Sequence, residues 1–480
     1  MRLLCVIITL CLFVSCKGQK KSENKALEER ISRIENGLQS NLRVKYGDSV
    51  SIQYYNIEER MKELKIHGLS IAVLNNGVVE WAKGYGMADT SQNKKVTAKT
   101  LFQAGSISKP IAATRALQLV EKGQLNLDTN VNDYLKSWKV PENEFTTKEK
   151  VTLRRLLNHS AGLTIHGFPG YSTNDAVPSV LDVLEGKGNT DAVRVFREPG
   201  EKVGYSGGGY TVMQLMISDT EQKEFSDILQ KEVLNPLGMT SSTYANPLPK
   251  SYHNLAAAGY KSDGSQVPGK WHTYPEMAAA GLWTTPSQLL LWAKAIQDTY
   301  QNKKDGFLKA QTVNEMVTDY GNNQGMGPYV VDHLFGHGGS DEGFVSDLRI
   351  WKAHPISVAI MVNSDNGNDI IQELFLSIAK EYNLPGIYHR LRTYSEQSKE
   401  QRARYVGLYQ FSEDTVAKVS IKDNGLEFSG GLVKNPIFLI PESDTLFFSS
   451  KSGTYFEFVF ENGSVTNLKV VGYNGKKISD

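Results

Sequence analysis

Hydrophobic and polar positions recur with different periods along this chain, and the changes of period mark its parts. Two apolar runs, 69–74 and 78–84, flank Asn75-Asn76-Gly77, a turn sequence typical of a β-hairpin. Strand-like runs return at 345–351 and 357–362, whereas the sequence between the two pairs alternates helical patterns with loops. Strands at both ends of a region with helices between them predict an α+β domain. In such a domain, helices flank one antiparallel sheet and a helical region completes the fold.

The pattern changes after residue 385, which we take as the end of a main domain that covers residues 46–385. Residues 386–404 are charged and polar and are predicted to form a linker. Residues 405–480 alternate strand-like runs with turns that contain Asn-Gly, and therefore predict a small antiparallel β domain. This domain contains no histidine and no convergent set of catalytic residues, so we interpret it as accessory.

The N-terminus reads as a targeting segment. An apolar run from Leu3 to Val14, preceded by Arg2, is too short to span a bilayer stably. It ends at Ser15-Cys16 and is followed by a polar stretch, residues 17–45, which is predicted to be a tether. Residues 1–16 resemble a bacterial lipoprotein signal, which implies that Cys16 is lipidated. The alternative is a plain secretory signal cut nearby. Both predict export, and the first predicts a lipid anchor in a cell-envelope membrane, with the protein facing the periplasm or the exterior.

Charge and cysteine content exclude several classes of function. The 53 basic and 52 acidic side chains balance, so the sequence does not predict a nucleic-acid partner. All three cysteines (Cys5, Cys11 and Cys16) lie in the targeting segment, so the mature protein is expected to have no disulfide and no cysteine nucleophile. None of the nine histidines stands in a zinc-protease motif. We therefore expect neither a metal nor a cofactor.

Ser106 and Lys109 form the strongest candidate for chemistry. A lysine three residues after a serine at the start of a helix lies on the same face, where its amine can help to take the hydroxyl proton. The chain contains three other serine-x-x-lysine tetrads, which begin at Ser22, Ser91 and Ser377. Only Ser106 leads into a helical pattern that is apolar on most faces, residues 111–120, as expected of a central helix. Ser106 is therefore the predicted nucleophile.

Two further motifs follow Ser106-Ile107-Ser108-Lys109 along the chain. Tyr205-Ser206-Gly207 opens a helical stretch, and His337-Gly338-Gly339 precedes a strand-like run. The three together resemble the motif set of the serine β-lactamases and penicillin-binding proteins, in the class C and esterase-like branch. The resemblance covers roughly residues 50–380 and includes further sequence segments, among them LLNHSAGL at 156–163 and AGLWTT at 280–285. It implies a β-lactamase/transpeptidase-like fold, and the C-terminal domain resembles the lipocalin-like appendage of some relatives.

The resemblance also implies a role for each residue of the site. Ser106 would be acylated, while Lys109 and Tyr205 would share the roles of general base and acid. The backbone N–H groups of Ser106 and Ser340 would form the oxyanion hole. The segment His337-Gly338-Gly339 would bind substrate. The substrate would be a small molecule or a peptide, including one derived from the cell wall, and the sequence leaves the oligomeric state open.

Two departures from the family pattern affect the expected substrate. Gly207 stands where β-lactamases usually have an asparagine, whose amide holds an amide of the substrate, and His337 replaces their usual lysine. These changes favour an ester or amide hydrolase, including one for D-amino acid peptides, over an efficient β-lactamase. They also lead us to ask whether Gly207→Asn raises turnover of a β-lactam. The alternatives are a β-lactamase or D-alanyl-D-alanine carboxypeptidase, and a catalytically inactive protein that binds in the cell envelope.

Other candidate residues carry less weight. Residues 204–208 also match the Gly-x-Ser-x-Gly motif of the nucleophile elbow in α/β-hydrolases. That elbow must follow a buried strand, and residues 197–202, which contain proline, glycine and four charges, are not expected to form one. His159 is expected to hydrogen-bond to backbone. His166, Tyr171 and Trp271 lie in loops that are open to a substrate, and none is assigned a role.

Overall fold

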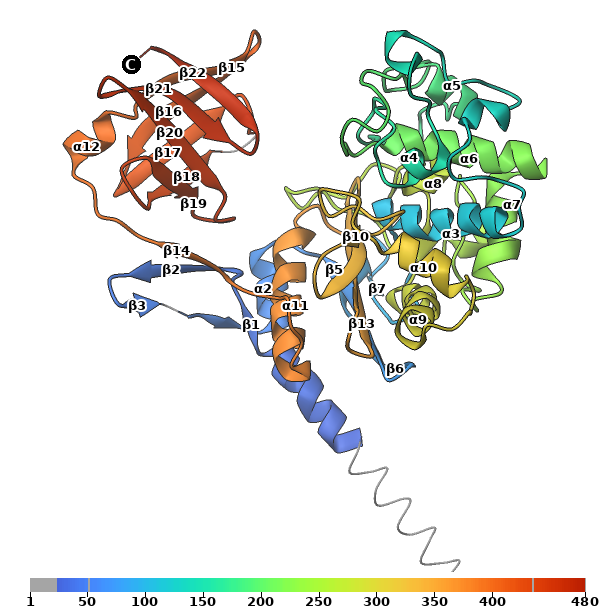
Figure 1. The fold of residues 1–480 in the computed structure, drawn as a ribbon. Helices are drawn as coiled ribbons and strands as arrows, with labels where there is room; N and C mark the ends of the chain where they lie inside the picture. Colours follow the sequence, from blue (N-terminus) through green and yellow to red (C-terminus); the bar gives the residue numbers. More distant parts are fainter. Residues whose placement is uncertain (1–23, 51, 434–435, 480) are drawn as a thin grey trace, which may run out of the picture. The chain divides into compact units, whose positions relative to one another are not determined.

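The computed structural model describes residues 24–50, 52–433 and 436–479 (Figure 1). The predicted signal segment, including Cys16, lies outside the described residues. The chain divides into two compact units: Ile57–Ile371, and a second unit made of the described residues up to Asn56 and from Gln372 onward. No helix in the described part of the chain combines the length and the apolar character needed to cross a membrane.

A seven-stranded antiparallel sheet forms the centre of the first unit, in the order β10-β11-β12-β13-β5-β6-β7. The predicted hairpin joins β5 to β6, and Asn76 and Gly77 both have positive φ, as the tightest hairpin turns require. Strand β5 pairs with β13 from Leu69↔Val362 to Asn75↔Ile356, so the two ends of the unit meet inside one sheet. The strands are β5 (Gly68–Asn75), β6 (Val78–Asp89), β7 (Lys94–Lys95), β10 (Tyr329–Val330), β11 (Leu334–Asp341), β12 (Phe344–Trp351) and β13 (Ile356–Val362).

The middle of this sheet is covered on both faces. Every residue of β12 and β13 is buried; β13 is apolar except for Ser357, whereas β12 also buries Asp347 and Arg349, which form an ion pair at 2.9 Å. Helix α9 (Pro286–Asn302) lies against β13 and β5. It begins at Thr285, whose hydroxyl accepts the backbone N–H of Gln288, and it buries the apolar face that contains Leu289 and Trp292.

The helical region surrounds α3 (Ser108–Glu121) (Figure 1). Its small residues, such as Ala112 and Ala116, are fully buried, which allows close approach of α6 and α8. Helix α3 ends at Glu121, and Gly123 just beyond its C-cap Lys122 adopts a positive φ of 70°. The other helices of the unit are α2 (Ile57–Glu63), α4 (Leu153–Leu157), α5 (Val180–Leu184), α6 (Gly207–Glu221), α7 (Phe225–Leu229), α8 (Met277–Ala280) and α10 (Ala310–Met316).

In the second unit, the C-terminal domain is antiparallel, as the turn pattern predicted, and its eight strands close into a barrel, which is consistent with the lipocalin-like resemblance. Closure pairs every strand and leaves no open edge. Aromatic side chains fill its core, including Tyr405, Tyr409 and Phe458, and the Tyr409 hydroxyl donates to the Tyr405 carbonyl. The strands are β15 (Gly407–Ser412), β16 (Thr415–Lys422), β17 (Gly425–Gly430), β18 (Ile437–Pro441), β19 (Leu446–Ser449), β20 (Tyr455–Glu461), β21 (Ser464–Val470) and β22 (Tyr473–Ser479).

The remaining segments of the second unit contain regular structure. Residues 24–35 are helical, and β2 (Leu42–Tyr46) pairs in parallel with β14 (Arg390–Thr393). Strand β14 and helix α12 (Lys399–Ala403) fall within the segment expected to be a linker. Helix α11 (Gly367–Tyr382) begins in the first unit and continues into the second from Gln372. It contains the tetrad that begins at Ser377, whose hydroxyl donates to the carbonyl of Ile34.

Candidate active site

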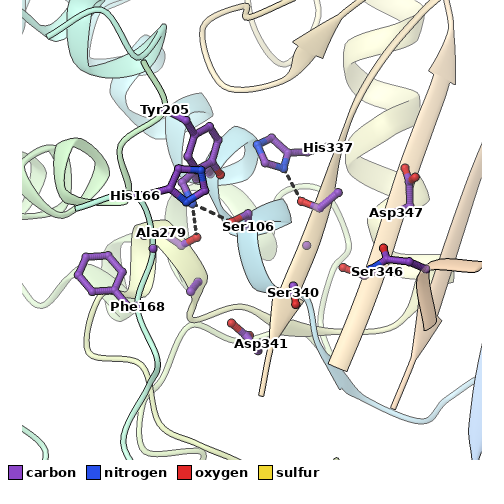
Figure 2. Close-up of a pocket in the computed structure, with 16 residues that line it drawn as sticks. Ser106, His166, Phe168, Tyr205, Ala279, His337, Ser340, Asp341, Ser346 and Asp347 are labelled. Carbon is purple, nitrogen blue, oxygen red and sulfur yellow. Dashed lines mark hydrogen bonds between the residues drawn. The ribbon is translucent and has the colours of Figure 1, made fainter. Parts of the chain in front are cut away.

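Ser106 and Lys109 lie at the start of the central helix, with their side chains in contact. Ser106 belongs to a single 3₁₀ turn, Gly105–Ile107, that leads directly into α3. The Lys109 Nζ donates to the Ser106 Oγ at 2.9 Å and to the backbone carbonyl of Ala279 at 2.8 Å (Figure 2). Lys109 is 2% exposed, whereas Ser106 is partly accessible. A buried amine is thus held against a hydroxyl that a substrate can reach.

Strand β11 packs directly against this turn. A Cβ on Gly105 would lie 2.4 Å from the Ser340 nitrogen, and one on Gly339 would lie 1.9 Å from the Ala104 oxygen, so only glycine fits at either position. Strand β10 pairs with β11 at Phe335 and Gly336, and residues 337–341 line the pocket beyond them. The backbone of Ser340 is therefore placed beside Ser106.

Tyr205 lies next to Lys109, between three histidine rings. The Lys109 Nζ is 5.0 Å from the centroid of the Tyr205 ring. His159 stacks on Tyr205 at 4.1 Å between centroids, and His166 and His337 lie at 4.9 and 6.1 Å. An aromatic enclosure of this kind fixes the phenol in one orientation beside the amine.

Ser206, which follows Tyr205, has a structural position. It is buried and forms the N-cap of α6, because its Oγ accepts the backbone N–H of Gly209 while its hydroxyl donates to the carbonyl of Thr164. Residues 197–204 form turns and coil. The nucleophile-elbow interpretation therefore lacks its strand.

Two of the three histidines are neutral at physiological pH. Burial, followed by the nearby Lys109 charge, lowers the pKa of His337 to about 3 and that of His159 well below its usual range. The His337 Nδ1 donates to the carbonyl of Gly338, which leaves Nε2 unprotonated. The His159 Nδ1 accepts the backbone N–H of Ser206, as expected of a histidine that bonds to backbone. The family's usual lysine is thus replaced by an uncharged ring.

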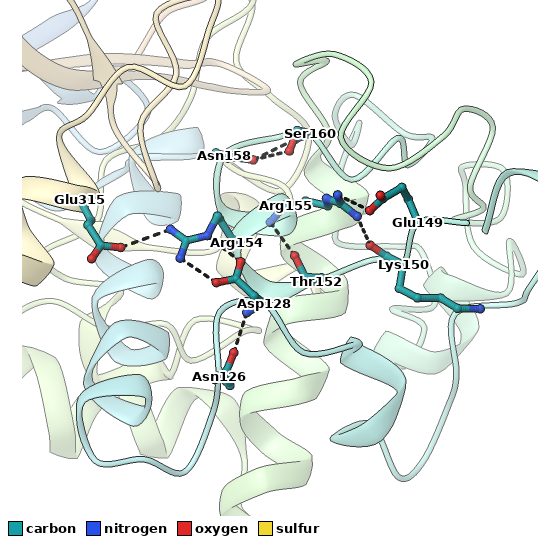
Figure 3. Close-up of polar contacts among 10 residues, drawn as sticks. All are labelled: Asn126, Asp128, Glu149, Lys150, Thr152, Arg154, Arg155, Asn158, Ser160 and Glu315. Atoms are coloured by element: carbon teal, nitrogen blue, oxygen red, sulfur yellow. Dashed lines mark hydrogen bonds and ion pairs between the residues drawn. The ribbon is translucent and has the colours of Figure 1, made fainter. Parts of the chain in front are cut away.

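A polar network surrounds α4, the helix that directly precedes Asn158 and His159 (Figure 3). Arg154 binds the Asp128 carboxylate through two nitrogens, at 2.7 and 2.9 Å, and Glu315 at 3.2 Å. Asn158 then ends the helix, and the backbone turns at His159 with a φ of 61°. This turn points the imidazole towards Tyr205.

A pocket of about 590 Å³ brings the predicted residues together. Its lining includes every predicted catalytic, oxyanion-hole and substrate-binding residue: Ser106, Lys109, Tyr205, His337, Gly338, Gly339 and Ser340. Their positions agree with the expected roles, and the roles themselves stay predictions. Of the three loop aromatics without an assigned role, His166 lines the pocket, whereas Tyr171 and Trp271 are absent from its lining.

The sequence analysis missed several parts of this pocket. The Ala279 carbonyl that binds Lys109 precedes the recognised AGLWTT phrase, but a backbone acceptor has no side-chain signature. Phe168 and Asp341 also line the pocket, and burial raises the pKa of the Asp341 carboxyl well above its usual range. Asp341 directly follows the predicted oxyanion residue. Burial also raises the pKa of the Glu276 carboxyl to about 7.

Comparison with known proteins gives a consistent result. The family model described as Beta-lactamase matches residues 56–381. The protein flp of Staphylococcus aureus strain N315 is 28% identical over 239 residues, which span 49% of this chain and 45% of that protein. The chain thus matches less than half of that relative's length.

Solved structures show the same fold. The octameric penicillin-binding protein homologue from Pyrococcus abyssi superposes with a TM-score of 0.58 and 22% identity, covering 87% of this chain and 98% of that one. The D-amino acid amidase from Ochrobactrum anthropi SV3 superposes with a TM-score of 0.57 and 21% identity, covering 68% of this chain and 97% of that one. Both comparisons support the predicted β-lactamase/transpeptidase-like architecture.

Proposed function

Because this chain belongs to the β-lactamase family of serine hydrolases, we propose that it hydrolyses an ester or amide through an acyl-enzyme on Ser106. The observation that carries the proposal is the contact of the Lys109 Nζ with the Ser106 Oγ at 2.9 Å, beside Tyr205 and inside a substrate-sized pocket. An unassisted serine hydroxyl is a weak nucleophile at neutral pH, and an adjacent base removes that barrier.

In the proposed reaction, the Ser106 Oγ attacks the carbonyl carbon while the Lys109–Tyr205 pair, with one of its two groups deprotonated, accepts the hydroxyl proton. The N–H groups of Ser106 and Ser340 stabilise the oxyanion of the tetrahedral intermediate. The intermediate collapses when the leaving group takes a proton from the Lys109–Tyr205 pair. Water then attacks the acyl-enzyme and the same pair takes its proton. The pair returns that proton to the Ser106 Oγ as the bond to the acyl carbon breaks, which releases the acid product and regenerates the Ser106 hydroxyl.

The neutral His337 affects which charge the substrate can carry. A lysine at this position would offer a positive charge to a substrate carboxylate, and a buried imidazole with a pKa of about 3 does not. We propose that the leaving group is an uncharged alcohol or amine. The substrate class then comprises esters and amides, including D-amino acid amides or peptides, a class that the name of the Ochrobactrum relative supports.

Labelling with a fluorescent phosphonate tests the nucleophile. We expect the wild type to be labelled and to hydrolyse p-nitrophenyl acetate, and Ser106→Ala to do neither. Ser91→Ala is the matched control, because Ser91 begins another serine-x-x-lysine tetrad in an exposed turn. An unlabelled wild type without ester turnover would support the alternative of an inactive binding protein.

Export through a lipid anchor is the second part of the proposal. The supporting observation is the apolar run that ends at Ser15-Cys16. In a bacterial host, the full chain should partition into the membrane fraction, and Cys16→Ala should move it to the soluble fraction. Equal partitioning of the two forms would contradict lipidation at Cys16.

A further inference from the structure

Gly207 occupies the position where β-lactamases usually place an asparagine, and a loop fills the space of that side chain. A Cβ on Gly207 would lie 3.0 Å from Phe168 Cε2 and 3.1 Å from the carbonyl oxygen of His166. Both contacts are tighter than a Cβ normally makes. The segment 165–168, which we call the acyl loop, therefore occupies the space into which a side chain at position 207 would extend.

The acyl loop is fixed to the start of helix α6. The N–H of Gly207 donates to the His166 carbonyl at 3.1 Å, and the N–H of Gly208 donates to the Ile165 carbonyl at 3.1 Å. These are N–H groups of the first helical turn, which have no partner within the helix. Ile165 adopts a φ of 65°, which is unfavourable for a β-branched residue and persists only where surrounding contacts impose it. The loop is thus part of the built site.

The acyl loop presents an apolar ring to the pocket. Phe168 and His166 are both among the residues that line it, as are Ala279 and Ala280. A phenyl ring neither donates nor accepts a conventional hydrogen bond, unlike the amide of an asparagine. A substrate amide placed against it would lose water without gaining a partner, whereas an apolar group would gain from burial.

We propose that Phe168 determines acyl-group specificity, and that the preferred acyl group is an uncharged aryl or branched alkyl group without an amide beside the reacting carbonyl. This inference rests on the proposed acyl-enzyme function and narrows its substrate class, because D-amino acid amides and peptides carry an amine or an amide beside the reacting carbonyl and fall outside the preferred group. The ring of Phe168 takes the place of the missing amide and selects by apolar contact. Penicillins and acylated D-alanyl peptides, which carry such an amide, are poor substrates on this basis.

Two esters with one leaving group test the proposal. For Phe168→Ala we expect kcat/KM for p-nitrophenyl phenylacetate to fall about tenfold relative to that for p-nitrophenyl acetate, since one apolar contact discriminates by that order. Phe196→Ala is the matched control, because Phe196 is 51% exposed and lies outside the pocket lining. It should leave the ratio unchanged. An unchanged ratio of the two kcat/KM values in Phe168→Ala would overturn the inference. If the wild type hydrolyses neither ester, the proposed function itself would be refuted.

A second test asks whether Phe168 occupies the space that an asparagine at position 207 would need. Gly207→Asn alone should not raise nitrocefin turnover, because the acyl loop blocks the new side chain. Gly207→Asn combined with Phe168→Ala removes the ring and should raise turnover above that of the single variant, with both variants folded by tryptophan fluorescence. Equal turnover in the two variants would show that Phe168 does not occupy the place of the amide.

Discussion

His337 should lower the free energy of unfolding of the unit Ile57–Ile371 in acid, and the size of the effect follows from the burial of its ring. Its side chain is 6% exposed, and its pKa of about 3 lies below the unfolded value of 6.5. Between these values the unfolded chain binds a proton that the folded chain does not, so stability is lost as pH falls below 6.5. The contribution is fully present above 6.5.

The magnitude can be worked for about pH 4.5. The unfolded histidine is almost fully protonated there, two pH units below its pKa, whereas the folded ring is still neutral. At about 1.4 kcal/mol per unit, the free energy of unfolding falls by about 2.7 kcal/mol. His337→Gln keeps a polar side chain of similar length and cannot titrate, so it should lack this loss.

Urea unfolding at about pH 7.5 and about pH 4.5 measures the difference. All six tryptophans lie in the unit Ile57–Ile371, so tryptophan fluorescence follows that unit alone. The loss between the two pH values should be about 2–3 kcal/mol larger in the wild type than in His337→Gln. Titrating groups away from His337 contribute equally to both proteins and cancel. Equal losses would refute the reasoning that burial keeps His337 neutral.

Three further outcomes are expected. Lys109→Met should lower kcat for p-nitrophenyl acetate by about a thousandfold because it removes the base, and a loss below about tenfold would contradict that role. The Glu276 carboxyl has a pKa of about 7 in the folded protein and 4.5 in the unfolded chain. The folded state therefore favours the protonated carboxyl, and the free energy of unfolding falls as pH rises from 4.5 towards 7. Glu276→Gln should therefore gain about 3 kcal/mol relative to the wild type between about pH 4.5 and about pH 8, measured by urea unfolding, and a constant difference would be inconsistent with burial of the charge. Gly339→Ala should lower the free energy of unfolding by about 1–3 kcal/mol, because its Cβ would lie 1.9 Å from the Ala104 oxygen. Gly338→Ala, whose Cβ would meet its nearest atom at 3.7 Å, should unfold like the wild type, and equal melting of the two variants would argue against this packing of β11.

Short-range patterns predicted much of the architecture. The Asn76-Gly77 turn predicted the β5–β6 hairpin because few residues adopt two successive positive φ angles. The apolar run after Ser106 predicted a central helix, and α3 is buried on most sides. Strand periodicity and Asn-Gly turns predicted the C-terminal β domain, which closes into a barrel. In each case neighbouring residues determine the element.

The candidate site was predictable only in part. The motifs of Ser106, Tyr205 and His337 are recognisable because each requires particular side chains at fixed local spacing. The sequence did not show that the Ala279 carbonyl would bind Lys109 at 2.8 Å, or that His159 would stack on Tyr205. These contacts join segments more than 40 residues apart, as the separation of 170 residues between Lys109 and Ala279 illustrates.

The sequence by itself determined the identity and order of the reactive groups and the family fold that holds them. Tertiary structure alone decided what surrounds those groups. It placed a neutral His337 in the low-dielectric pocket, and it filled the side-chain space of Gly207 with Phe168. The physical reason is that nucleophile and base act through local spacing along a helix, whereas protonation and substrate selection depend on burial and excluded volume. Those two quantities arise only when distant segments pack together.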